Sequence, residues 1–144
     1  MNNENLITHL YEWISNIQKI ENRKMRLGDS GEYFPSDIRL MKAVNQYPNL
    51  NITEISEVLN VTKGTLSKLV NKLTNQECLE KFKKEDNKKN VYVRLTSLGK
   101  SVLDDFDAFR KHHKVNLDAE LNQFSQDELI AIDKFLCVIN KKVF

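Results

Sequence analysis

Two helical patterns separated by a very short connection restrict the fold of this chain more than any other feature. The first pattern covers 52–59 and follows Asn51, which forms an N-cap pair with Glu54. Asn60 favours the left-handed backbone that ends a helix, and Thr62 is the expected N-cap of the next one. Two helices joined by about three residues have the spacing of a helix-turn-helix unit.

The second helix of this pair, expected over 62–75, has two contrasting faces when its residues are placed at 100° intervals. Apolar side chains predict a buried face that consists of Leu66, Leu69, Val70 and Leu73. The opposite side carries lysine, asparagine and serine without a carboxylate, which suits the major groove of DNA, and the start of the helix offers N–H groups to a phosphate. The candidate DNA contacts are Thr62, Lys63, Gly64, Thr65, Ser67, Lys68, Asn71, Lys72 and Asn75. The alternative is a solvated face that happens to lack acids.

The segment before this unit is expected to form a loop over 28–34 and then a helix. Pro35 supplies a turn, Ser36 the N-cap, and Asp37 an acidic residue in the first turn. This helix must stop before Pro48, and its buried stripe is Ile38, Met41 and Val44.

After Leu79 the apolar period changes from 3.6 residues to two, which predicts strands. Tyr92 and Arg94 alternate with apolar neighbours in one half-buried strand, and a weaker extended stretch covers 79–84. The polar segment 85–90 between them predicts a β-hairpin with a basic tip. Such a tip can reach phosphates or a minor groove, although a charge run by itself is more often a solvated turn.

Charge is distributed unevenly and divides the chain into three segments. Residues 1–36 hold 4 basic and 5 acidic side chains, residues 37–100 hold 12 and 7, and residues 101–144 hold 6 and 8. We therefore expect an amino-terminal dimerisation helix and loop, a basic DNA-binding lobe, and carboxy-terminal dimerisation helices, within one compact domain. With 4 glycines and 2 prolines, the chain should be mainly α-helical with a small β-hairpin.

Amphipathic patterns at both ends of the chain need a surface to pack on. The opening helix has apolar residues at spacings of three and four, and the last helix, begun by a capping box of Ser125 and Glu128, repeats that spacing. These stripes could pack within one chain, but a dimerisation layer shared by two subunits is the more economical interpretation. Its candidate residues are Leu6, Leu10, Ile14, Leu129, Ile132, Leu136, Ile139 and Val143.

Signals for export, membrane insertion and catalysis are missing from the sequence. The apolar runs are too short to span a bilayer, and the start lacks the features of a signal peptide, so a cytoplasmic location is expected. Without a phosphate loop, nucleophile elbow or paired metal motif, we expect no enzyme activity, metal or cofactor. Adjacent His112 and His113 point about 100° apart on a helix and cannot chelate one ion together. Whether they, Cys78 or Cys137 have a sensing role stays open.

The stretch ITEISEVLNVTKGTLSKLVNKLTNQECLEKF (Ile52–Phe82), followed by DNKKNVYVRLTSLGKSVL (Asp86–Leu103), resembles the MarR family of winged helix-turn-helix regulators. The second stretch contains the exit from the family's wing into the next helix, at Leu95–Gly99. The resemblance extends over nearly the whole chain. It implies a homodimer that places two recognition helices in successive major grooves of a pseudo-palindromic operator, with the wings in the flanking minor grooves.

The resemblance also implies roles for wing residues and an effector. The family's wing usually carries Asp-x-Arg, at positions occupied here by Asn87 and Lys89, so we expect a mobile wing with mainly electrostatic contacts. The candidate wing contacts are Asn87, Lys88, Lys89 and Arg94. Repression is the family default, and many members release DNA when a small molecule, metal or oxidant acts. Possible pocket residues are Trp13, Tyr33 and Phe34, although such aromatic residues are more often core.

The sequence therefore predicts a DNA-binding transcriptional regulator with double-stranded DNA and a second copy of the chain as partners. An effector is compatible with this prediction, but its identity is not given by the sequence. The alternative is a winged-helix protein-interaction module that does not bind DNA. The basic centre and the Lys/Asn face argue against that alternative.

Overall fold

The computed structural model describes residues 3–142 of the 144-residue chain, so Val143 lies outside the described residues. The chain consists of two compact units, which meet in sequence after Asp107, inside a helix. The mainly helical fold class is confirmed. The elements are α1 (Asn3–Glu21), β1 (Met25–Arg26), β2 (Glu32–Tyr33), α2 (Pro35–Gln46), α3 (Ile52–Val58), α4 (Lys63–Asn75), β3 (Leu79–Lys84), β4 (Asn87–Leu95), α5 (Ser97–Leu121) and α6 (Gln126–Lys142).

The ends of α3 and α4 follow the capping residues expected from the sequence. Asn51 Oδ1 accepts a hydrogen bond from the Glu54 N–H at 2.9 Å, and the Glu54 carboxylate accepts the Asn51 N–H at 2.8 Å. Asn60 has a left-handed backbone with a φ of 52°, and Thr62 Oγ1 accepts the Thr65 N–H at 3.1 Å. These local bonds fix the short connection between the two helices, and the predicted helix-turn-helix is confirmed.

The start of α2 differs from the prediction. Phe34 is the N-cap residue, and Pro35 occupies the first helical turn, where its missing N–H costs no hydrogen bond. The Asp37 carboxylate accepts the Phe34 N–H at 2.9 Å. Ser36 lies inside the helix, so its assignment as the N-cap was wrong. The helix ends at Gln46, as Pro48 requires.

The core of the first unit lies where α2, α3 and α4 meet one another and β4. Apolar side chains from these four elements are almost completely buried, among them Ile38, Leu40, Met41, Val44, Ile55, Leu66, Val70, Leu73 and Val93. On α4 the predicted inward face is therefore buried, except that Leu69 is only half-buried. Burial of each such side chain contributes about 1.5–3 kcal/mol, so this stripe decides which side of α4 faces outward.

The loop expected over 28–34 contains β2 and the turn of a small hairpin, whose other strand, β1, lies just before that segment. Gly28 and Gly31 form its turn with φ angles of 51° and 110°, a conformation that other residues rarely adopt. The Ser30 hydroxyl donates to Asp105 on α5, and the Tyr33 hydroxyl donates to the Ser30 carbonyl at 2.9 Å. The hairpin escaped prediction because two paired residues in each strand are too few to display a period of two.

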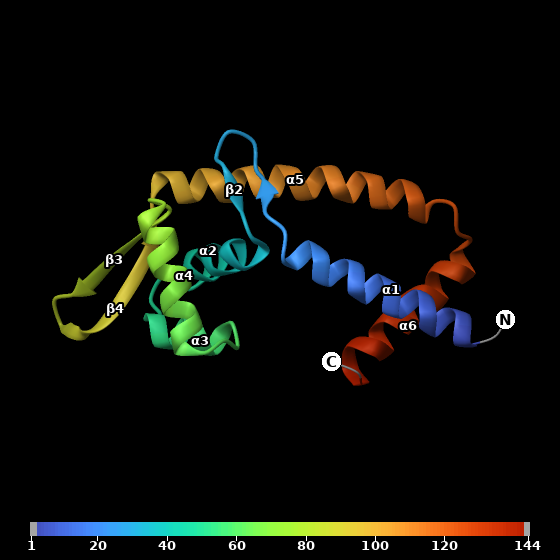
Figure 1. Ribbon diagram of the computed structural model, residues 1–144, viewed down its shortest axis with the longest axis horizontal. Coiled ribbons are helices and arrows are strands. Elements are labelled where there is room, and N and C mark those ends of the chain that lie inside the picture. Colours follow the sequence, from blue (N-terminus) through green and yellow to red (C-terminus); the bar gives the residue numbers. More distant parts are fainter. Residues whose placement is uncertain (1–2, 143–144) are drawn as a thin grey trace. The chain divides into compact units, whose positions relative to one another are not determined.

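The predicted hairpin after α4 consists of β3 and β4, which we call the wing (Figure 1). Its turn is shorter than expected, because β4 begins at Asn87 and only Glu85 and Asp86 connect the strands. The end of the wing is therefore acidic, and Lys88 and Lys89 lie on the strand behind it. The predicted turn over 85–90 was too long, because Asn87 of the polar segment already pairs with Lys84.

Tyr92 on β4 is only 6% exposed, although the alternating pattern predicts that it points outward. Its ring packs against Phe82 of β3, with 5.6 Å between the ring centroids. Its backbone also forms an isolated antiparallel bridge with Asn51, just before α3. The segment at Asn51 therefore covers the wing near Tyr92, so that neither face of the hairpin is fully exposed to solvent there.

The base of the wing meets the start of α5 through a close backbone contact. Thr96 Oγ1 accepts the Gly99 N–H at 3.1 Å, and the Thr96 N–H donates to the Cys78 carbonyl at 3.1 Å. A Cβ at residue 99 would lie 2.2 Å from that same carbonyl oxygen. Glycine at this position therefore allows α5 to start directly against the wing.

The second unit contains the rest of α5 together with α6. The Ser125 N–H donates to the Glu128 carboxylate at 2.8 Å, and the Glu128 N–H donates to Ser125 Oγ at 3.3 Å, so the predicted capping box is confirmed. These bonds lower the pKa of the Glu128 carboxyl. The candidate dimerisation residues of α6 are not fully buried: Leu136 is 44% exposed, and the half-buried ones are Leu129, Ile132 and Ile139.

Within the first unit, α1 likewise has no buried residue. Leu6 is exposed, and Leu10 and Ile14 are half-buried. Larger apolar side chains beside them, Tyr11 and Trp13, are also more than half exposed. None of the helices between residues 3 and 142 combines the length and apolar character needed to cross a membrane.

Substitution of Gly99 by alanine should lower the free energy of unfolding by roughly 3 kcal/mol, because the new Cβ would collide with the Cys78 carbonyl. The matched control is Gly64→Ala on α4, where a Cβ meets nothing within 4 Å. That change should stabilise the fold by about 0.4–1 kcal/mol through the unfolded state. Urea unfolding followed by circular dichroism at one protein concentration measures both. Equal effects of the two substitutions would contradict the close contact.

Candidate nucleic-acid interface

The outward side of α4 carries the polar side chains that the sequence singled out. The buried leucine and valine stripe turns them away from the core, and most of them are exposed: Thr62, Lys63, Gly64, Thr65, Ser67, Lys68, Asn71 and Asn75. No acidic residue lies on this helix. The result is a surface of amide, hydroxyl and ammonium groups, which can donate to the base edges and phosphates of a major groove.

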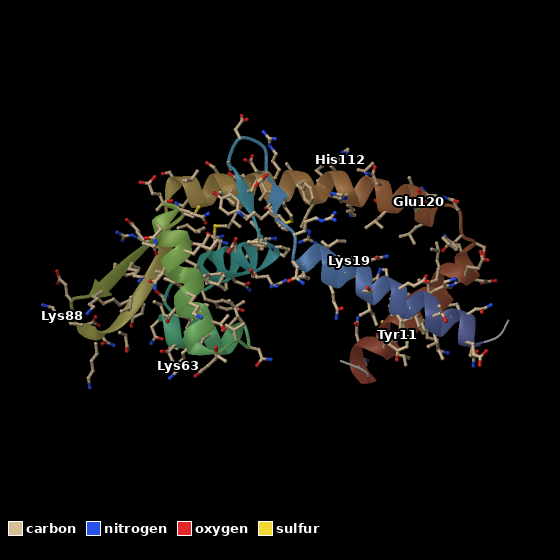
Figure 2. The ribbon with its side chains drawn as sticks, viewed as in Figure 1. Tyr11, Lys19, Lys63, Lys88, His112 and Glu120 are labelled. Atoms are coloured by element: carbon tan, nitrogen blue, oxygen red, sulfur yellow. The ribbon has the colours of Figure 1, made fainter. Side chains whose placement is uncertain are left out.

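The amino-terminal end of α4 is suited to a phosphate. Thr62 caps the helix through its bond from the Thr65 N–H, and the Thr62 hydroxyl also donates to Thr65 Oγ1 at 2.9 Å. The first N–H groups of a helix have no acceptor within it, so those of Lys63 and Gly64 face outward. Lys63 adds a cation at this end, as Figure 2 shows. Groups of this kind can bind a phosphate.

Lys72 has a different environment from the other candidates on α4. Its Nζ lies 2.5 Å from Oδ2 of Asp37, whose side chain is completely buried, and 4.8 Å from the centre of the Phe34 ring. The other oxygen, Asp37 Oδ1, is buried without a hydrogen-bond partner in the described part of the chain. Lys72 therefore holds α4 to the start of α2, and the structure places it away from the open polar face.

The four wing candidates divide into two pairs. Lys88 and Lys89 are exposed, and Lys88 lies near the end of the wing in Figure 2. Asn87 Oδ1 accepts the N–H groups of Lys89 at 3.2 Å and of Asn90 at 3.3 Å, so Asn87 steadies the start of β4. Arg94 pairs with the carboxylate of its cross-strand neighbour Glu80. Only the two lysines present unpaired ammonium groups among these four.

Arg94 has a second contact that further limits its reach. Its guanidinium lies 5.0 Å from the centre of the Phe82 ring, on the neighbouring strand. An arginine that pairs with a carboxylate and stacks on an aromatic ring at once is held along the strand. The structure thus places Arg94 in the framework of the wing, at some distance along β4 from the turn.

Sequence reasoning missed the lysines of β3. Lys81 is exposed and donates a hydrogen bond to Asn71 Oδ1, which joins the wing to the polar face of α4. Lys83 is also exposed, and Lys84 lies 4.3 Å from the centre of the Tyr92 ring. The excess of basic residues from Lys81 onward did indicate that this region could contact DNA. It could not show which lysine reaches α4, because that depends on the path of the strand.

The buried cysteine lies beside a buried tyrosine. Cys78 Sγ is 3.4 Å from the Tyr33 hydroxyl, and both side chains belong to the core. Burial raises the pKa of the Cys78 thiol and also the pKa of the Tyr33 hydroxyl. Both groups are therefore protonated and uncharged at neutral pH. The other cysteine, Cys137, is exposed on α6.

Possible effector or metal residues are not brought together. A cavity of about 480 Å³ in the first unit is lined by α2, α5 and the end of β4, through Lys42, Asn45, Gln46, Leu95, Lys100, Leu103, Asp104 and Asp107. Trp13, Tyr33 and Phe34 do not line it. Within residues 3–142, no three His, Cys, Asp or Glu side chains are grouped as a metal site requires. His113 packs against Phe109, with 4.3 Å between the ring centroids.

Substitution of Lys72 by methionine should lower the free energy of unfolding by roughly 3 kcal/mol, because it leaves the buried Asp37 carboxylate without its cation. The double variant Asp37→Asn/Lys72→Met should regain much of this loss, since no charge remains buried. Lys68→Met is the control, because Lys68 is exposed on the same helix and should change stability by less than about 0.5 kcal/mol. Denaturant unfolding measures all three. Equal stability of Lys72→Met and Lys68→Met would rule out a structural role of the ion pair.

Comparison with known proteins agrees with this geometry. Residues 35–99 match the family model of a winged helix DNA-binding domain. The chain is 30% identical to the HTH-type transcriptional regulator PchR of Bacillus subtilis (strain 168) over 101 residues, which are 70% of this chain and 60% of PchR. The chain thus spans about three fifths of the length of this relative.

Solved structures share the fold over almost the whole chain. FabT of Streptococcus pneumoniae, in complex with DNA, has a TM-score of 0.72 and 19% identity, with 99% of this chain and 97% of FabT covered. ZitR of Lactococcus lactis, a zinc-responsive MarR family member, has a TM-score of 0.75 and 16% identity, with coverage of 99% and 100%. The named relatives are regulators and not enzymes, which agrees with the prediction of no enzyme activity. Residues 35–99 thus match a winged helix DNA-binding domain, and the chain shares the fold of ZitR, a MarR family member, over almost its whole length.

Proposed function

We propose that this protein is a homodimeric repressor that binds a pseudo-palindromic operator. The observation that carries the proposal is the acid-free polar face of α4, which the buried side of the same helix turns outward. In the proposed complex this face enters a major groove. The N–H groups at the start of α4 bind a phosphate, and Lys88 and Lys89 contact the backbone beside the minor groove.

Exposed apolar side chains support the homodimer. In the described residues they are concentrated in α1, with Leu6, Ile7, Tyr11, Trp13, Ile17 and Ile20, and in residues 115–138, with Val115, Leu117, Leu121, Phe124, Ile130, Phe135, Leu136 and Val138. Exposed apolar surface on this scale is typical of a protein interface. A dimer with two-fold symmetry presents two recognition helices to two half-sites about one helical turn apart, which matches the symmetry of a palindrome.

Control by a small molecule is a further part of the proposal. The volume of the cavity between α2, α5 and the end of β4 is within the range of small-molecule sites. Lys42 at this cavity lies 3.6 Å from Asp107 and 4.6 Å from the centre of the Phe106 ring. An anionic ligand that competes for Lys42 would act on the packing of α2, which supports α4. Repression, rather than activation, rests on the default of the family.

Lys68→Ala should weaken binding to a selected operator by about 1–3 kcal/mol and relax the base preference at one position. Lys88→Ala and Lys89→Ala should instead weaken binding to all duplexes and reduce the salt dependence of the affinity. Gel-shift titrations at several salt concentrations with specific and random duplexes measure both effects. Lys114→Ala, which removes an exposed lysine from α5, is the control. Unchanged affinity in all the variants, or retention on DNA–cellulose that is insensitive to salt, would favour a protein-interaction module.

The solution mass should be twice the 16.8 kDa of one chain. Leu136→Glu should shift the protein toward the monomer, because it places a carboxylate in the proposed interface. Val58→Glu is the matched control: Val58 is 48% exposed, close to the 44% of Leu136, but lies on α3. Sedimentation equilibrium measures the mass of each variant. A monomeric native protein, or a Leu136→Glu variant that dimerises as the native protein does, would contradict the proposed assembly.

A further inference from the structure

Lys81 and Asn71 form a hydrogen bond that changes which donors and acceptors the polar face of α4 offers. Lys81 Nζ lies 2.5 Å from Asn71 Oδ1, and both side chains are exposed. One residue belongs to β3 of the wing and the other to the polar face of α4. The amide that the sequence analysis assigned to base recognition is therefore already engaged by a cation before DNA binds.

The register of the wing explains why Lys81 reaches this position. Lys81 pairs with Val93 of β4, and cross-strand partners point to the same face of a hairpin. Val93 is 2% exposed, so this is the face that the wing turns toward the core of the first unit. Leu79, which is 1% exposed, anchors the start of β3 beside the end of α4. From this strand the long side chain of Lys81 extends along α4 to Asn71.

The chemistry of lysine determines which end of the amide points outward. An ammonium group has only donors, so the Asn71 atom that faces it must be the carbonyl oxygen. The amide NH₂ group is then left to face away from Lys81. Asn71 Nδ2 and Lys81 Nζ together form a pair of hydrogen-bond donors, and the acceptor of the amide lies next to a positive charge.

The two purines respond differently to such a donor pair. Guanine presents two acceptors in the major groove, N7 and O6, whereas adenine presents the N7 acceptor and the N6 amino donor. A free asparagine matches adenine, because it offers one donor and one acceptor. With Lys81 beside the amide oxygen, the adenine amino group would meet an ammonium group, while guanine O6 would accept from it.

We propose that Lys81 determines base specificity by making Asn71 read guanine instead of adenine. This inference rests on the proposed function, since it requires α4 to enter a major groove. Lys81 acts here as a positioning residue for the Asn71 amide and supplies the second donor. The wing thereby contributes to base recognition through β3, in addition to the backbone contacts proposed for Lys88 and Lys89.

The test uses the full-length protein and a pool of random-sequence duplexes, from which bound DNA is selected and sequenced. Asn71→Ala identifies the base pair that Asn71 reads, as the position whose preference disappears. At that position the native protein should prefer guanine over adenine by on the order of tenfold in affinity. Lys81→Met should abolish this preference or reverse it toward adenine. Lys81→Arg retains hydrogen-bond donors and should therefore keep the preference for guanine.

Lys83→Met is the matched control, because it removes the same charge from an exposed site on the same strand. It should lower the affinity for all duplexes and keep the guanine preference. Thermal unfolding followed by circular dichroism shows whether each variant is folded. The inference is overturned if the native protein prefers adenine at this position, if Asn71→Ala alters no base preference, or if Lys81→Met keeps the native one. If the native protein selects no sequence from the pool at all, the proposed function itself fails.

Discussion

Burial of the apolar side of α4 is the interaction on which the rest of the molecule depends. Leu66, Val70 and Leu73 are almost completely buried against α2 and α3, and this packing turns the opposite, acid-free side of the helix outward. The outer side chains need no contacts of their own to be held in place. Hydrophobic burial itself has no preferred direction. It nevertheless orients the polar side of α4, because a helix fixes the angle between its apolar and polar faces.

Two polar contacts refine the position of this helix. The ion pair between Lys72 and the buried Asp37 ties α4 to the first turn of α2, and the bond from Lys81 to Asn71 ties it to the wing. The wing is in turn connected to α5, where Gly99 allows the helix to approach the Cys78 carbonyl. Recognition helix, wing and α5 are therefore linked, so a change in the packing of α2 or α5 can reach the proposed DNA-binding surface.

Much of the first unit could be predicted because its signals are local. Capping by Asn51, Glu54 and Thr62 depends on residues three positions apart, and the period of the apolar residues distinguishes the helices from the wing. Predictions failed where longer contacts decide the outcome. The β1–β2 hairpin has too few paired residues to show a period, and Tyr92 is buried because Phe82 and the segment at Asn51 cover it.

The sequence by itself determined the helix-turn-helix, the wing, and the set of polar residues on the outer side of α4, since spacing along one chain encodes all three. Only the tertiary structure decided which of those residues are available to a ligand. Lys72 and Arg94 are engaged by Asp37 and Glu80, and Asn71 is bonded to Lys81, although all three look free in the sequence. The reason is that a long charged side chain takes its partner from whichever element the fold brings within reach, and one helical pattern holds no information about that neighbour.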